Sequence, residues 1–101
     1  MFATDDDLVF GYTDVVVLRD RIFALYSGRR RRDYPGRAVY GGSVHVFSYS
    51  GVLRSVAILP SDAIAMAASE RDSALYIAVQ DPEPAIIALN AAPLLRSGRS
   101  P

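Results

Sequence analysis

The sequence passes twice through one pattern, over residues 14–54 and again over residues 62–96. Each pass opens on an aspartate that precedes an apolar run, at Asp14 and at Asp62. Each continues into a second apolar run that holds a Leu-Tyr pair, and each ends on a Leu-Arg pair. A repeat of about 40–50 residues built from short apolar runs is typical of β-propeller blades, each of which is one small antiparallel sheet.

The apolar runs within each pass predict short β-strands. In the first pass these are 15–18, 22–26, 44–49 and 52–59, and in the second 63–68, 74–79, 85–89 and a doubtful fourth at 94–96. The β-branched run 15–18 predicts a strand buried on both faces. Residues 63–68 are rich in helix-favouring alanine, but their place in the repeat favours a strand. Pro60 is expected to end the strand 52–59.

The chain is therefore predicted to be all-β, with about two four-stranded antiparallel blades of an incomplete six-bladed β-propeller. The expected segments are a partly disordered N-terminal segment over 1–13, a blade over 14–59, a second and incomplete blade over 60–96, and a disordered tail over 97–101. A propeller needs at least four blades to close. Two blades leave sheet faces and edges uncovered, so self-association through the exposed blade faces is expected.

Composition excludes several classes of site and partner. The sequence has 11 basic and 11 acidic residues, so no overall charge favours nucleic acid or a membrane surface. It has no cysteine, which excludes disulfides, thiolate metal sites and a cysteine nucleophile. No run approaches the roughly 18 apolar residues of a membrane span, and the N-terminus does not resemble a signal peptide. The compartment is left open.

The long loop over residues 27–43 carries a run of four arginines: Arg29, Arg30, Arg31 and Arg32. Guanidinium groups suit bidentate contacts with oxyanions, so this run is a candidate binding site for an anionic ligand. We favour the alternative, a solvated loop balanced by Asp33 and the acidic N-terminus. Without interleaved aromatic residues, the run is weak evidence for nucleic-acid binding, and no nucleic-acid partner is predicted.

His45 is the only histidine and the second candidate ligand-binding residue. We favour a packed strand histidine with one ring nitrogen hydrogen-bonded. A metal site would need more ligands than the scattered aspartates offer, so no metal is predicted. The nucleophile elbow of serine hydrolases is absent, as is a phosphate-binding loop. The sequence therefore predicts no catalytic residue and no cofactor.

Three segments resemble the TolB-like six-bladed β-propellers, in particular a group of bacterial propeller lipoproteins. They are 21–29, 44–51 and 74–87, which read RIFALYSGR, VHVFSYSG and ALYIAVQDPEPAII. The order of these segments resembles the last two blades of such a propeller, and the missing fourth strand of the second blade fits that position. The preceding blades and the lipoprotein signal with its cysteine are absent from this sequence. The resemblance implies an extracytoplasmic location if the start is truncated.

The resemblance implies a non-catalytic binding or interaction module whose partner is an unidentified protein or small molecule. The alternative is a fragment of a propeller enzyme, a hydrolase or lyase, whose catalytic residues lie outside this chain. A third interpretation is a small self-contained β-sandwich, which predicts a cooperatively folded monomer. The two-blade interpretation instead predicts marginal stability, aggregation or oligomers.

Overall fold

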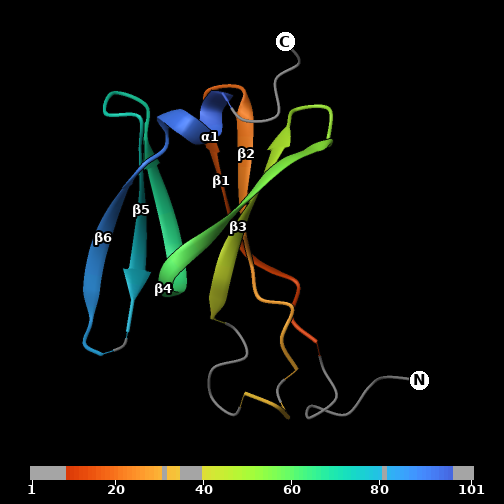
Figure 1. Cartoon of the computed structure of the whole chain (residues 1–101), viewed down its shortest axis with the longest axis vertical. Coiled ribbons are helices and arrows are strands. Elements are labelled where there is room, and N and C mark those ends of the chain that lie inside the picture. The colour runs from red at the N-terminus through yellow and green to blue at the C-terminus, as the bar shows by residue number, and fades with distance from the viewer. Residues whose placement is uncertain (1–8, 31, 35–39, 81, 97–101) are drawn as a thin grey trace.

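The computed structural model describes residues 9–30, 32–34, 40–80 and 82–96, which form one antiparallel sheet and a short helix (Figure 1). The elements are β1 (Tyr12–Leu18), β2 (Arg21–Tyr26), β3 (Gly41–Ser48), β4 (Leu53–Ser69), β5 (Ala74–Val79), β6 (Ala85–Asn90) and α1 (Ala92–Arg96). Neighbours in sequence are neighbours in the sheet, in the order β1-β2-β3-β4-β5-β6. The sheet curves like a half-barrel. The all-β prediction is confirmed.

β4 is a single strand of 17 residues that belongs to both halves of the sheet. Its first part, Leu53 to Ile58, pairs with β3, and its second part, Ala63 to Ser69, pairs with β5. Ala63 also pairs with Gly41 of β3, so it belongs to both ladders. Figure 1 shows β4 crossing from one half to the other. The prediction that Pro60 ends a strand is wrong. Pro60 takes part in none of the registered pairs with β3 or β5, so its missing N–H removes no ladder hydrogen bond there.

One hydrophobic core lies on the side of the sheet where its two halves face each other. Every strand from β1 to β5 contributes to it, and the core residues of β2, β3 and β5 alternate as the two-residue period of a strand requires. In β4 a register shift after Ala63 moves the next core residue to Met66. The fully buried large side chains are Leu18, Phe23, Leu25, Val44, Val46, Leu75 and Ile77. Leu25 and Leu75, the leucines of the repeated Leu-Tyr pairs, therefore lie in the same core cluster. Each such side chain contributes about 1.5–3 kcal/mol by leaving water.

Side chains hold β1 beside the second part of β4. The backbone N–H of Met66 donates to Asp14 Oδ2 at 2.8 Å. At the end of β1 the backbone N–H of Arg19 donates to Glu70 Oε1 at 3.0 Å, and the Arg19 guanidinium donates to Ser73 Oγ at 2.8 Å. These bonds join the β1–β2 turn to the β4–β5 turn and keep the sheet curved around its core.

Two further predicted details differ from the structure. The strand predicted over 15–18 begins at Tyr12 and is buried on one face only, because Val15 is 54% exposed and Val17 is 50% exposed. Residues 94–96 belong to helix α1, not to a fourth strand. The helix begins where Asn90 Oδ1 accepts the backbone N–H of Ala92 at 3.0 Å. The predicted disorder at both ends falls largely on residues 1–8 and 97–101, which lie outside the described residues.

Candidate functional site

The side of β1, β2, β3 and the first part of β4 that points away from the core carries a nearly continuous apolar surface, called here the outward face. Its large exposed members are Tyr12, Val15, Val17, Leu53, Val56 and Ile58, with exposed fractions from 48% to 80%. The strand register aligns them in rows. One row runs from Val15 through Ala24 and His45 to Val56. None of the residues in these rows carries a formal charge.

An aromatic cluster occupies the middle of the outward face. It consists of Tyr12, Tyr26, His45 and Phe47. The rings of Tyr26 and His45 stack, with centroids 4.5 Å apart and an interplanar angle of 24°. Tyr12 meets both His45 and Phe47 edge-on, with centroids 5.3 and 5.9 Å apart. The cluster gives the outward face a rigid centre, because each ring is held by at least two others.

His45, a candidate ligand-binding residue, is part of this cluster. Its Nδ1 lies 2.8 Å from the hydroxyl of Tyr12, and its ring stacks on Tyr26. This is the environment expected of a packed strand histidine with one nitrogen hydrogen-bonded. Within the described residues, no group of three or more histidine, aspartate or glutamate side chains is arranged to hold a metal ion.

Arg29, the first arginine of the run, is committed to a contact within the protein. Its two terminal nitrogens donate to the two carboxylate oxygens of Asp62, each at 2.8 Å. The guanidinium also lies over the ring of Tyr34, 4.8 Å from the centroid. The hydrogen bond to Asp62 raises the pKa of Arg29 above its ordinary value. This bidentate pair fixes the loop after β2 to the middle of β4.

The other arginines of the run do not share the position of Arg29. Arg30 is exposed, and its backbone carbonyl accepts hydrogen bonds from the backbone N–H groups of Asp33 and Tyr34 at 3.1 Å. Arg32 is exposed and also makes an interaction of its own. Arg31 lies outside the described residues. The structure thus places Arg29 beside Asp62. It places His45 elsewhere, among the aromatic rings of the outward face.

Sequence reasoning missed the roles of the two aspartates that open the repeat. Asp14 accepts the backbone N–H groups of Val15 at 2.9 Å and of Met66 at 2.8 Å, which ties β1 to β4. Asp62 accepts both donors of Arg29. The signal was present, because each aspartate holds the first position of its pass through the repeat. What the sequence could not reveal was the partner of each carboxylate.

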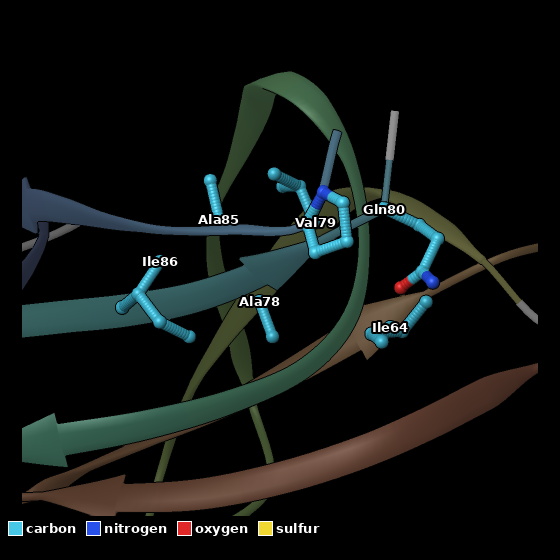
Figure 2. A pocket seen from close by; sticks show the side chains of 7 residues that line it. Ile64, Ala78, Val79, Gln80, Ala85 and Ile86 are labelled. Carbon is cyan, nitrogen blue, oxygen red and sulfur yellow. The ribbon is translucent and has the colours of Figure 1, made fainter. Parts of the chain in front are cut away.

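The second half of the sheet has two shallow apolar hollows that meet at Ile86. One, of about 330 Å³, is lined by Ile64, Ala78, Val79, Gln80, Pro84, Ala85 and Ile86 (Figure 2). Figure 2 shows Ala78 and Ile86 on one side of β5 and β6 and Ala85 on the other. The other hollow, of about 270 Å³, is lined by Ala65, Met66, Ala67, Tyr76, Ile77, Ala78 and Ile86. Neither lining contains a charged side chain, so both hollows suit apolar contacts.

Comparison with protein-family models, curated proteins and solved structures finds no match to this chain. Within the described part of the chain, the helical segment is too short to cross a lipid bilayer. The arrangement of residues on the outward face is therefore the main evidence on function.

Proposed function

We propose that this chain is a non-catalytic interaction module of the TolB-like β-propeller type, and that its outward face packs against the β-sheet of a neighbouring unit. The observation that carries this proposal is the outward face itself. Its exposed side chains include Val56 at 48% and Ile58 at 80% exposure. Soluble proteins seldom leave a contiguous apolar patch of this kind uncovered, and such patches mark interaction sites.

The shape of the outward face favours a sheet as its partner. Its side chains follow the rows of a four-stranded antiparallel ladder, so they present a regular surface with the two-residue period of a strand. Two sheets pack about 10 Å apart when their apolar inner faces interdigitate. The face carries no formal charge along these rows, so a charged partner surface would lose its hydration without a compensating pair.

The repeat supports the same proposal. Two passes through one pattern build the two halves of the sheet, and the first pass leaves the outward face available for a preceding unit. Repeat units that cannot bury both faces alone are stabilised by stacking on neighbours. A preceding blade would bring an apolar sheet of the same kind to the outward face.

The double variant Val56→Asp, Ile58→Asp tests the proposal on the full chain. The dye 1-anilinonaphthalene-8-sulfonate should bind the native chain and emit strongly, because it binds exposed apolar surface. The double variant should lose most of this emission, and in sedimentation velocity it should lose the associated species larger than a dimer that grow with concentration. Far-UV circular dichroism checks that the sheet is retained.

The control is Ile64→Asp, which adds one negative charge, half of what the double variant adds, to an isoleucine that is 40% exposed on the second part of β4, outside the outward face. It should reduce neither signal by as much as the double variant does. If the native chain binds no dye, or if the double variant behaves like the native chain in both measurements, the outward face is not an interaction surface and the proposal fails.

A further inference from the structure

The outer edge of β6 is the open edge of the described sheet. β6 is the last strand, and its only strand partner among the described residues is β5. Charged residues and proline usually protect an edge strand from pairing. The sequence of β6, AIIALN, contains neither. Four of its six residues are exposed, and Ile86 is 69% exposed.

The other end of the sheet is not open in the same way. Along β1, the carboxylate of Asp14 accepts the backbone N–H of Met66, and the backbone N–H of Arg19 donates to Glu70. These contacts place the second part of β4 against β1. An added strand would have to break them, so β6 offers the edge for pairing.

The hydrogen bond after β6 shows which backbone groups point outward. The N–H of Ala91 donates to the carbonyl of Ser73 at 2.8 Å, which extends the β5–β6 ladder by one pair. In an antiparallel pair, successive residues alternate between those that bond the partner and those that point away. The ladder from Ala85 to Asn90 has no register shift. Ile86, Ala88 and Asn90 therefore direct their N–H and C=O groups to the open edge.

We infer that the open edge of β6 pairs antiparallel with the same edge of a second copy of this chain, centred on Ala88. A two-fold axis perpendicular to the sheet relates the two strands, so each residue faces one with the same side-chain direction. Ile86 of one copy then lies opposite Asn90 of the other, and Ala88 lies opposite Ala88. These pairs use every outward-pointing backbone group of β6 and form about six N–H···O bonds.

The side chains of β6 suit this arrangement. On the core side, Ile87 of one copy lies opposite Leu89 of the second copy. Both residues already pack on the hydrophobic core, so the core face continues across the axis. Opposed apolar pairs stabilise antiparallel strands, and β6 brings no like charges into opposition. The second copy is favoured over a charged peptide for this reason.

This inference goes beyond the proposed function, because it concerns the edge of β6 and not the outward face. Single cysteine variants test it, since the chain has no cysteine of its own. Across the axis, a hydrogen-bonded pair places its Cα atoms about 5.5 Å apart, which a disulfide can span. Ala88→Cys should therefore form a disulfide-linked dimer under mild oxidation. The matched control Ile86→Cys should not, because its two copies would lie roughly 13 Å apart along the strands.

A proline variant tests the backbone directly. Ala88→Pro removes an N–H that points to the open edge and leaves the β5–β6 bonds in place. In sedimentation velocity it should weaken the dimer about tenfold or more, because each dimer loses two hydrogen bonds. Ala88→Ser keeps the N–H and should form the dimer as the native chain does. If Ala88→Pro does not fold, the two cysteine variants still decide the question.

Several outcomes would overturn the inference. One is a dimer that cross-links no better through Ala88→Cys than through Ile86→Cys. Another is efficient cross-linking through Ile87→Cys, which would place the axis at a different residue. A third is association that survives Ala88→Pro but disappears in the Val56→Asp, Ile58→Asp variant, which would support the outward face alone.

Discussion

Arg29 and Asp62 form a bidentate ion pair that joins the loop after β2 to the middle of the strand shared by both halves of the sheet. Both N···O distances are 2.8 Å, and the Arg29 side chain is 17% exposed. Because Asp62 opens the second pass of the repeat, this pair also links the first pass to the start of the second. It explains why one arginine of a run of four is fixed while Arg30 is exposed.

Arg29→Lys should lower the free energy of unfolding by about 1 kcal/mol, since an ammonium keeps the charge but cannot make the paired contact. For a chain of this size the thermal midpoint should fall by about 4–8 °C. Arg30→Lys is the matched control and should leave the midpoint unchanged, because Arg30 is exposed. Equal midpoints for the two variants would show that the pair does not stabilise the fold.

The raised pKa of Arg29 determines how the stability that this pair contributes changes with pH. Pairing raises the pKa of Arg29, so its contribution to stability is fully present below the ordinary pKa of arginine and is lost only as the pH rises through the higher folded value. In urea titrations, the stability difference between native chain and Arg29→Lys should therefore be constant from pH 6 to pH 9. A difference that fell steeply within this range would contradict the assignment.

Asp14→Ala should destabilise the chain by about 1–2 kcal/mol, because the Met66 and Val15 N–H groups both lose their acceptor. Amide hydrogen exchange at Met66 should accelerate more than exchange at Ile77, a fully buried residue of the neighbouring strand. The control Asp33→Ala removes a carboxylate from an exposed residue of the loop after β2. It should change neither stability nor exchange at Met66.

Gly28→Ala should destabilise the chain and disturb the aromatic cluster. Gly28 has a φ of 65°, and a Cβ there would lie 2.6 Å from the ring of Tyr26, which stacks on His45. The expected cost is about 1–2 kcal/mol from the left-handed backbone alone. The ring signals of His45 should shift in NMR spectra. Gly11→Ala is the control, because a Cβ at Gly11 would meet no atom within 4 Å.

Arg19→Gly should be more stable than Arg19→Ala by about 1 kcal/mol. Arg19 has a φ of 56°, which glycine adopts without steric cost. Both variants lose the guanidinium bond to Ser73, so their difference isolates the backbone term. Urea unfolding of the two variants measures it. If alanine were equally well tolerated, the left-handed turn would contribute no strain.

The repeat was sufficient to predict an all-β antiparallel chain and the approximate places of its strands, because apolar periodicity and turn residues act locally. Pro60 misled that prediction, since proline ends a strand only where its N–H is needed by a partner. Pro60 lies where the β3–β4 ladder shifts register between Ile58 and Ala63, and nothing in the local sequence reveals that irregularity. Residues 94–96 were also misassigned. The Asn90 side chain accepts the backbone N–H of Ala92 where helix α1 begins, and the apolar pattern of the sequence does not reveal this hydrogen bond.

The candidate site shows the same division between local and long-range information. That His45 would be packed with one nitrogen bonded follows from its place in an apolar strand. That its partner is Tyr12, 33 residues away, does not follow from sequence. The run 15–18 predicted a strand buried on both faces, yet the side chains of Val15 and Val17 are exposed on the outward face. A run of valines indicates that a strand carries much apolar surface, but it does not indicate which part of the protein covers that surface.

The length of β4 has a consequence for how the chain unfolds. Because one unbroken strand from Leu53 to Ser69 belongs to the ladders of both β3 and β5, neither half of the sheet can detach without exposing part of the other. The two passes of the repeat are thus coupled mechanically as well as thermodynamically. A pulling force applied to one half reaches the other along a covalent backbone, with no linker between them to extend first.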